Sequence, residues 1–390
     1  MFFSLYSPVA ISFFLILHCY VLWKLLPCIA KKWRMIGSLI YFVLSAIFLT
    51  FPLLLRYGLL AGGSRQVEIM FALSITEFVL VSMLCSAIVF TDVLRICLGL
   101  WDRWRKTDLE PRITLRKASV FSLAAVACVV IYGCFEAWNV RRVDILIPTE
   151  KLPPGVSHLR IVQVSDVHLG GVYYTSHLER IMKIVREAEP DIFVVTGDLV
   201  DGNMRHRLRE SELVAAHGAK YGAFAVTGNH EYYYNIDEAV EFIAKSGLTL
   251  LDDSFAEAGG IVIVGLDDNT EIWPPKLDVP KDRFVLLLKH HPQIPKFGAG
   301  KFDLQLCGHT HGGQIWLCNL AMKRAYNMTQ GMSKHGGSLV YVSNGAGFWG
   351  PPLRLLAPPE VTVFDLVNVN AVSSAPQKYR VQKMRVLTYT

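Results

Sequence analysis

Acid, amide and imidazole side chains gather in five short segments, each at the end of an apolar run. The segments are 166–168 (DVH), 197–201 (GDLVD), 228–231 (GNHE), 290–292 (HHP) and 308–314 (GHTHGGQ). The first four runs are typical of strands, so each polar cluster is expected where a strand gives way to a loop. Open α/β sheets build their sites at that edge. Carboxylate, amide and neutral imidazole ligands that converge there predict a metal site of hard-to-borderline character.

The supply of ligands predicts two divalent ions. A metal pair ~3.5–4 Å apart can polarise a phosphoryl oxygen, activate a water and clamp both oxygens of an in-line displacement, and it needs about seven ligands with one carboxylate shared. Mixed oxygen and nitrogen ligation admits Mn, Fe or Zn, so the sequence does not name the metals. The predicted ligands are Asp166, His168, Asp198, Asn229, His290, His309 and His311.

The spacing within the segments supports this convergence. In an extended segment residues i and i+2 lie on one side, which pairs Asp166 with His168 and His309 with His311. Glycines at 197, 228 and 308 let the backbone turn tightly beside the ions.

Two polar residues, His230 and Asp201, remain after the ligands are counted. A histidine held by a carboxylate is typical of a general acid or of a group that stabilises transition-state charge. His291 is a separate case, because it lies behind the ligands, is exposed, or touches metal or substrate.

From residue 159 the chain alternates apolar runs with amphipathic stretches, which predicts an α/β layered domain. Two packed sheets with helices outside would reconcile a helix-rich first half with a strand-rich second half. Strands are expected at 143–147, 159–164, 191–196, 223–227, 248–251, 261–266, 284–288, 304–307, 339–342 and 361–366, and residues 380–390 could add another. Helices are expected at 177–188, capped by Ser176, at 209–217, and at 236–245, capped by Asn235.

The first third of the chain carries the apolar excess that brings the whole to 52% apolar. Four stretches approach the roughly 20 apolar residues that span a bilayer. The first is expected to be a retained helix and not a signal peptide, because no basic residue precedes Lys24. The four stretches are 1–23, 36–55, 69–90 and 118–138. The expected domains are therefore a membrane region at 1–138, a connector at 139–158, a soluble domain at 159–368 and a tail at 369–390.

Charge is uneven between these stretches. Basic residues concentrate at 24–34 and 95–117, which by the positive-inside rule lie in the cytoplasm, so the soluble domain is expected outside. One miscounted span would reverse that side. The basic residues of these loops account for the net charge of +6, which therefore suggests no nucleic-acid partner. Glu77, inside the third stretch, serves a transport path, pairs within the helix bundle or lies near the outer interface.

D-x-H, G-D-x-x-D, G-N-H-E, L-x-x-H and G-H-x-H, in this order, resemble the signature of the calcineurin-like metallophosphoesterase superfamily over roughly 159–366. Segments 308–314, 344–347 (NGAG) and 351–354 (PPLR) resemble its membrane-associated bacterial branch. That branch includes phosphodiesterases and a UDP-2,3-diacylglucosamine pyrophosphatase of lipid A synthesis. The N-terminal spans are similar to those of its transmembrane members.

The resemblance implies a four-layer αββα sandwich and a role for each residue. Asp198 would bridge the metals, and His230 would contact the phosphate and leaving group, oriented by Asp201. Asp166, His168 and His311 would bind one metal, and Asn229, His290 and His309 the other.

The expected protein is a membrane-anchored hydrolase of the bacterial inner membrane, with its catalytic domain extracytoplasmic. It would cleave a phosphodiester or pyrophosphate bond with a metal-bridging hydroxide, and a lipid-linked substrate such as a UDP-diacylglucosamine-like molecule is one option. The alternative is a transporter or receptor whose outer domain binds phosphorylated ligands without turnover. Substrate and oligomeric state stay open.

Three further features keep more than one interpretation each. Arg354 could meet a substrate phosphate or form a structural salt bridge. The aromatic residues at 232–234 could line a substrate groove, lie with Phe348 and Trp349 at the membrane surface, or pack in a plain loop. Cys307 and Cys318 could pair in an oxidising compartment or remain packed thiols.

Overall fold

The computed structural model describes residues 8–56, 65–105, 113–170, 174–205, 207–280, 282–326 and 328–369. The chain divides into two compact units, Met1–Gly133 and Cys134–Thr390. The strand expected at 380–390 lies outside the described residues.

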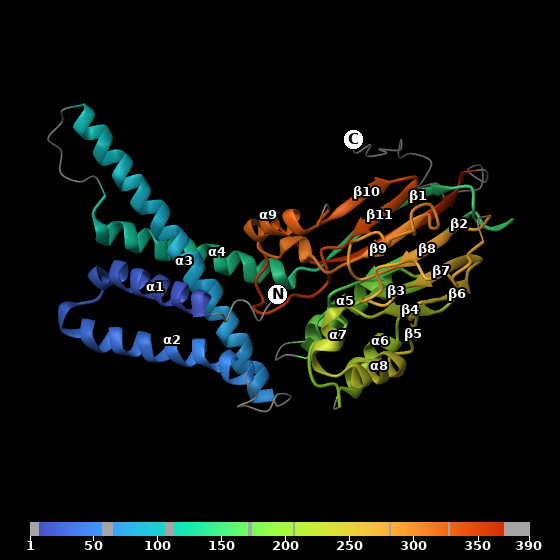
Figure 1. Ribbon diagram of the computed structural model, residues 1–390, viewed down its shortest axis with the longest axis horizontal. Coiled ribbons are helices and arrows are strands. Elements are labelled where there is room, and N and C mark those ends of the chain that lie inside the picture. The colour runs from blue at the N-terminus through green and yellow to red at the C-terminus, as the bar shows by residue number, and fades with distance from the viewer. Residues whose placement is uncertain are drawn as a thin grey trace. The chain divides into compact units, whose positions relative to one another are not determined.

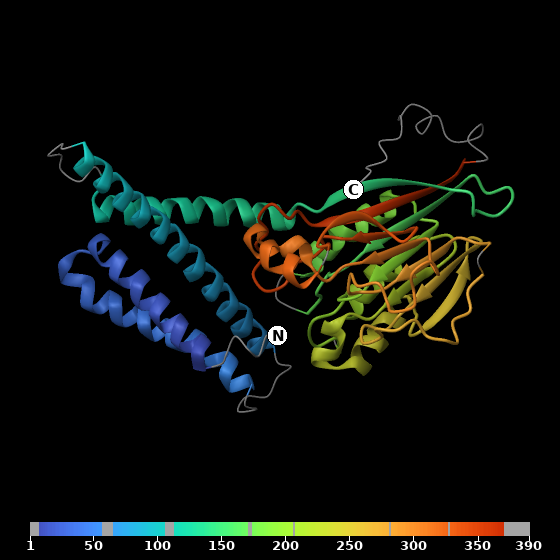
Figure 2. The same ribbon diagram turned by 45° about the horizontal axis from the view of Figure 1, so that its top comes forward.

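The first unit holds four apolar helices, each long enough to cross a membrane by length and composition. Helices α1 and α2 lie side by side (Figures 1 and 2). Helix α3 has 40 residues and at ~1.5 Å per residue is about twice as long as a bilayer core is thick. Arg95 and Arg103 therefore lie on the helix and not in the connection predicted to begin after residue 90. The bounds are α1 Pro8–Leu25, α2 Arg34–Arg56, α3 Arg65–Trp104 and α4 Leu115–Trp138, with single turns at Leu26–Cys28 and Lys31–Trp33.

Polar side chains in this unit meet one another between helices. Glu77 accepts a hydrogen bond of 3.2 Å from Ser45 and lies 3.3 Å from Nε2 of His18. Asp92 pairs with Lys24 and accepts from the Tyr20 hydroxyl at 2.8 Å. The interpretation of Glu77 as paired within the bundle is thus the one that the structure supports.

The second unit contains two six-stranded mixed sheets. The first has the order β1-β12-β2-β3-β4-β5, and the second has the order β10-β11-β9-β8-β7-β6. In the first sheet β2 to β5 run parallel, and in the second β7, β8, β9 and β11 do. The first sheet comprises β1 Arg141–Thr149, β2 His158–Val164, β3 Ile192–Thr196, β4 Ala223–Val226, β5 Thr249–Leu250 and β12 Glu360–Asn368. The second comprises β6 Ser254–Ala258, β7 Ile261–Gly265, β8 Val285–Leu288, β9 Leu304–Cys307, β10 Gly331–His335 and β11 Ser338–Val342.

The two sheets stack face to face, with helices on the outer side of the first (Figures 1 and 2). Ile161 and Val194 of the first sheet join Leu286 and Leu306 of the second in one buried core. The central strands are apolar on both faces because they are covered on both. The helices are α5 Tyr174–Glu187, α6 Leu208–Ala215, α7 Asn229–Tyr234, α8 Ile236–Lys245 and α9 Trp316–Ala325, with a single turn at His311–Gly313.

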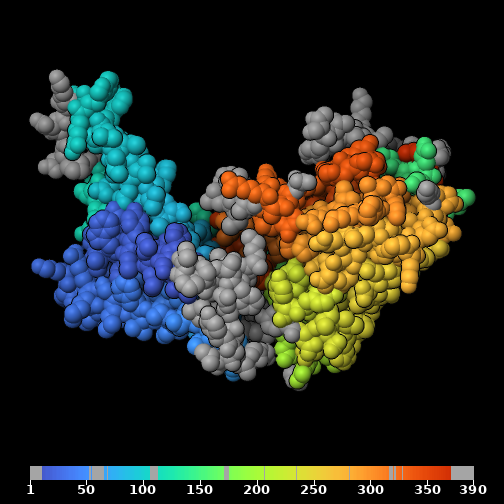
Figure 3. Space-filling model, in the orientation of Figure 1, coloured from blue at the N-terminus to red at the C-terminus, as the bar shows by residue number. Residues whose placement is uncertain are grey.

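The outer face of the second sheet is covered largely by loops. Trp273 and Leu277, from the connection between β7 and β8, pack with Phe302 on Val264 and Leu287. This sheet and the loops over it, coloured yellow to orange, form one continuous face of the unit (Figure 3).

The predicted two-sheet α/β fold behind four apolar helices is confirmed. Asn235 caps α8, accepting from the backbone N–H groups of Asp237 and Glu238. Ser176 does not cap α5, because that helix begins two residues earlier at Tyr174. The strand expected at 143–147 is β1, which pairs in parallel with β12 along its whole length.

Candidate metal centre

All five polar segments lie at the carboxyl ends of parallel strands. Those of the first sheet follow β2, β3 and β4, and those of the second follow β8 and β9. Since stacked parallel strands bring these ends to one edge, the seven predicted ligands and the pair Asp201 and His230 come together there, as the sequence predicted.

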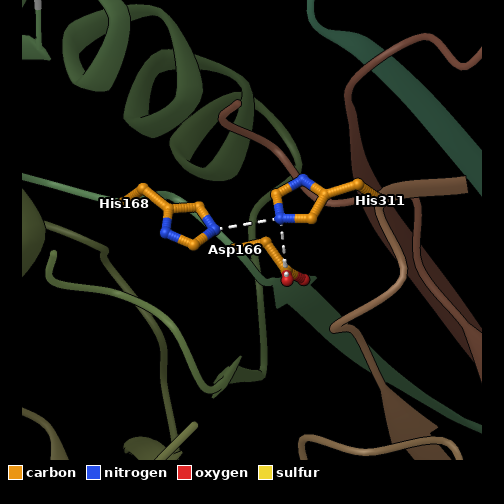
Figure 4. Close-up of side chains that lie close together, drawn as sticks. All are labelled: Asp166, His168 and His311. Carbon is orange, nitrogen blue, oxygen red and sulfur yellow. Dashed lines mark hydrogen bonds and ion pairs between the residues drawn. The ribbon is translucent and has the colours of Figure 1, made fainter. Parts of the chain in front are cut away.

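Asp166, His168 and His311 form the first cluster (Figure 4). Nε2 of His168 lies 2.9 Å from Nε2 of His311, which in turn lies 3.4 Å from Oδ1 of Asp166. The ligand atoms lie within 4.8 Å of one another. Two ring nitrogens that face each other beside a buried carboxylate suit a shared cation better than they suit each other.

The second cluster joins Asn229, His290 and His309. Nδ1 of His309 lies 2.9 Å from Oδ1 of Asn229 and 3.3 Å from Nε2 of His290. Nδ1 of His290 is held at 2.9 Å by the Thr196 carbonyl, which fixes the ring so that Nε2 faces the cluster.

Asp198 lies between the two clusters. Its Oδ2 is 3.1 Å from Nε2 of His290 and 3.8 Å from Nε2 of His168. Its Oδ1 accepts a hydrogen bond of 2.9 Å from the backbone N–H of His230. Burial opposes ionisation, but His290, His230 and His168 together hold the pKa of Asp198 well below its usual range.

Asp201 holds two histidines, of which the sequence predicted one. Its Oδ1 lies 2.8 Å from Nδ1 of His230, and its Oδ2 lies 3.3 Å from Nδ1 of His168. Burial works against the charged imidazole of His230, but Asp201 outweighs it and raises the pKa of His230 to about 9. Burial likewise disfavours the Asp201 carboxylate, but the two histidines lower its pKa to about 2.

The backbone of the site is held in sparsely populated conformations. Five of the predicted ligands have positive φ between 51° and 72°. Each such non-glycine residue costs about 1–3 kcal/mol, a strain that gathers where function requires a fixed geometry. At Gly308 a Cβ would overlap Ser165 and Asp166, so only glycine lets this loop approach the carboxylate. The five residues are Asp166, His168, Asp198, His309 and His311.

Two site residues were missed by the sequence analysis. Glu231, almost fully buried, accepts backbone hydrogen bonds from Asp198, Val200 and Gly228 at 3.0, 3.1 and 2.7 Å. Its place in Gly-Asn-His-Glu was a signal that could have found it. The Tyr326 hydroxyl lies 2.7 Å from Nε2 of His309, and no pattern around Tyr326 pointed to the site.

Arg354 follows neither predicted interpretation. It is fully buried and donates to the backbone carbonyls of Gly347, Asn344, Ala357 and His311 at 2.6 to 3.3 Å. Its guanidinium thereby ties the 344–357 loop to the loop that carries His311.

The structure also places His291 and Cys307, for which the sequence left more than one interpretation. His291 pairs with Asp268, and its ring lies tilted against that of His309 with centroids 3.9 Å apart, so it contacts a predicted ligand. Cys307 is a free thiol, and complete burial raises its pKa to about 12. The side chain of Cys318 lies outside the described residues.

Sequence comparison gives this site its family. Residues 159–313 match the model of the calcineurin-like phosphoesterase family. A metallophosphoesterase of Aquifex aeolicus is 35% identical over 245 residues, which cover 60% of this chain and 94% of that protein. The chain belongs to the calcineurin-like metallophosphoesterase family. It is therefore a hydrolase acting on phosphoric esters.

One further relative and one solved structure are similar to this metallophosphoesterase. A transmembrane protein with a metallophosphoesterase domain from Danio rerio is 30% identical over 272 residues, covering 63% of this chain and 62% of that protein. The crystal structure of TT1561 of Thermus thermophilus is 14% identical with a TM-score of 0.32, covering 48% of this chain and 90% of that one. The apolar helices and the transmembrane relative indicate that the metallophosphoesterase is associated with a membrane.

The donor set fits the divalent metals that this family uses. Carboxylate, amide and imidazole groups are the ligands that Mn, Fe and Zn accept. Asp166, His168 and His311 offer ligand atoms within 4.8 Å of one another, and so do Asp198, His290 and His309.

Proposed function

We propose that this metallophosphoesterase uses two divalent ions, Mn, Fe or Zn, to hydrolyse a phosphodiester or pyrophosphate bond. The observation that carries the proposal is the place of the Asp198 carboxylate, within 3.8 Å of a ligand nitrogen in each cluster. Asp198 would serve both ions, as one shared carboxylate in a two-metal site does. Asp166, His168 and His311 would hold one ion, and Asn229, His290 and His309 would hold the other.

When bound, such a pair supplies charge neutralisation at the phosphoryl oxygens and makes water a better nucleophile. The chain itself supplies the proton for the leaving group. With Nδ1 of His230 held by Asp201, only Nε2 is left to meet the substrate. Asp201 raises the pKa of His230 and so favours the protonated ring, which can stabilise negative charge and protonate the departing oxygen.

Turnover of a generic diester tests this proposal. The full-length protein, purified in detergent and reconstituted with Mn²⁺, should hydrolyse bis(p-nitrophenyl) phosphate. Asp198→Ala should lose metal-dependent hydrolysis, and His230→Ala should slow hydrolysis of the alkyl diester dibenzyl phosphate, whose leaving group needs a proton, about 10²- to 10⁴-fold. Asp144→Ala, at an exposed carboxylate on β1, is the matched control. Full activity of the Asp198 variant would overturn the mechanism.

The physiological substrate is proposed to be phosphorylated and lipid-linked, because an anchored enzyme meets substrates at the bilayer. A panel of lipid and nucleotide diesters and pyrophosphates, including a UDP-diacylglucosamine-like molecule, tests this class. Faster turnover of soluble nucleotides than of every lipid substrate would reject it.

The catalytic domain is proposed to comprise residues 159–368, with β1 completing its first sheet. The protein is proposed to lie in a bacterial inner membrane, with this domain on the side away from the cytoplasm. The basic segments at 24–34 and 95–117 support this orientation. A reporter fused after Thr390 that is active only in the cytoplasm would reverse it.

The alternative of a ligand-binding receptor without turnover is tested by the hydrolysis assay, because it predicts binding but no product.

A further inference from the structure

Two aromatic rings from separate segments flank His230. Tyr233 lies one turn along α7 and therefore shares a helix face with His230, with ring centroids 4.8 Å apart. Trp349, from the loop after β11, has its ring centroid 6.0 Å from that of His230. The side chain of Tyr233 is 65% exposed, and Trp349 is half-buried. These two rings therefore contribute little to the core but stand beside the predicted proton donor.

Trp349 is fixed by a side chain of the metal loop. Oε1 of Gln314 accepts from the Trp349 backbone N–H at 2.9 Å, and Nε2 of Gln314 donates to the Trp349 carbonyl at 2.8 Å. Gln314 itself has a positive φ of 51°, and its carbonyl accepts from the backbone of Leu355 at 2.9 Å. The segment that carries His309 and His311 thus also sets the position of the tryptophan.

The neighbouring residue anchors the loop from the other side. Phe348 is buried and packs against Trp138 and His177, with ring centroids 5.8 and 5.4 Å away. The interpretation that placed Phe348 at the membrane surface is therefore wrong. Because Phe348 is held in the core and the Trp349 backbone is held by Gln314, the Trp349 ring is presented beside His230 at little further entropic cost.

We propose that Tyr233 and Trp349 form an aromatic subsite that binds a planar ring on the leaving group of the substrate. The inference rests on the proposed function, which puts the leaving group at His230. A ring in this place can stack on one aromatic face and meet the other edge-on, arrangements that aromatic pairs prefer. A nucleoside or another aryl-bearing alcohol supplies the same planar ring, whereas a purely aliphatic alcohol does not.

Matched diesters test the subsite without changing the chemistry. Dibenzyl phosphate and bis(cyclohexylmethyl) phosphate have leaving alcohols of similar basicity and bulk, but only the benzyl groups carry planar rings. The wild type should favour dibenzyl phosphate in kcat/KM by about 2- to 13-fold, equivalent to ~0.5–1.5 kcal/mol of ring pairing beyond buried area. The dinucleoside phosphate thymidylyl-thymidine is the third substrate, and its rate relative to dibenzyl phosphate separates a nucleobase from a simple aryl group.

Substitutions then assign the preference to the two rings. Trp349→Leu and Tyr233→Leu should each bring the ratio toward 1, while Trp349→Phe should retain it. Phe255→Leu, at an exposed ring on β6, is the control that should leave the ratio unchanged. A wild-type ratio near 1, or an unchanged ratio in both leucine variants, would overturn the subsite.

Binding gives a second readout that does not depend on turnover. Calorimetry of the metal-loaded protein should show tighter binding of benzylphosphonate than of cyclohexylmethylphosphonate, and Trp349→Leu should remove the difference. If no diester is hydrolysed, the proposed function fails while this binding comparison still decides the subsite. Equal affinity for the two phosphonates rejects the subsite alone.

Discussion

The carboxylate of Glu231 accepts a hydrogen bond of 3.0 Å from the backbone N–H of Asp198, the residue that lies between the two ligand clusters. The same carboxylate accepts from Val200 and Gly228, so one buried side chain joins the loop after β3 to the loop after β4. Burial and the nearby Asp198 raise the pKa of Glu231 to about 7, against the effect of its backbone donors. The position of Asp198 therefore depends on a residue that itself need not touch metal or substrate.

Glu231→Gln should weaken the protein and the site together. An amide offers an N–H₂ group where a carboxylate oxygen had accepted, so at least one of the three backbone donors loses its partner. A buried unsatisfied donor costs about 1–3 kcal/mol, which corresponds to a fall in Tm of roughly 2–12 °C for a unit of this size. Differential scanning fluorimetry of the detergent-solubilised protein measures it, with the exposed Glu212→Gln as control. Equal Tm values for the two variants would contradict the role of Glu231.

Tyr326→Phe should lower metal affinity without unfolding the protein. The hydroxyl lies 2.7 Å from Nε2 of His309, whose Nδ1 faces Asn229, so it holds the ring with Nδ1 directed at the second cluster. Loss of a partner that orients a ligating histidine typically costs 10- to 100-fold in metal affinity. Competition with a chelator, read as bound Mn²⁺ per chain, measures the change. Tyr221→Phe, at a partly exposed tyrosine, should bind as the wild type does, and the same result for Tyr326→Phe would reject this role.

Arg354→Lys should destabilise the protein, although it keeps the positive charge. Its guanidinium makes five hydrogen bonds to four backbone carbonyls and lies 3.1 Å from Nδ1 of His311, an arrangement that needs a planar fork and that a lysine ammonium does not reproduce. The carbonyls left without a partner should cost about 3 kcal/mol and lower Tm by roughly 6–12 °C. Scanning fluorimetry of the metal-free protein isolates this structural effect from metal binding. Arg180→Lys, where the guanidinium donates to one carbonyl at an exposed position, should change Tm far less.

The positions of the predicted site residues could be inferred from sequence because each follows a strand. Apolar runs such as 192–196 are buried on both faces, so their ends are marked by an abrupt change to polar residues. Once the strands are parallel and adjacent, Asp166, Asp198 and Asn229 have to meet at one edge. Their roles as ligands remain a prediction, which the metal-binding and hydrolysis experiments test.

The features that the sequence did not indicate are either contacts between distant segments or elements with weak local patterns. β6 and β10 are edge strands with mixed, partly exposed patterns, so their apolar periodicity is weak. Helix α7 begins at Asn229, within the polar segment itself, and has only 6 residues. Tyr326 reaches His309 from the end of α9, a contact that no local pattern encodes. The partners of Arg354 are carbonyl groups, which every residue has, so its role required three-dimensional structure.

The pair His230 and Asp201 predicts how the rate depends on pH. The pKa of His230 is raised to about 9, so the protonated form persists through neutral pH and is lost as pH rises through about 9. For an alkyl diester, whose leaving group needs a proton, kcat should fall above that pH. For a p-nitrophenyl ester, whose leaving group departs without one, the fall should be much smaller. The same raised pKa stabilises the fold fully below about pH 6.5, and that contribution disappears as pH rises through about 9.

Asp201→Asn separates this origin of the pH dependence from others. Without the carboxylate at 2.8 Å, burial still opposes the charged imidazole and only the weaker effects of Asp198 and Glu231 favour it, so the pKa of His230 should fall and the alkaline limb should move to lower pH with it. Rates with dibenzyl phosphate from pH 5 to 10 at saturating metal, measured for both proteins, give the shift. Because Asp201 also lies 3.3 Å from Nδ1 of His168, bound metal has to be measured at each pH. A limb that stays in place at full metal occupancy would assign it to another group and remove His230 as the proton donor.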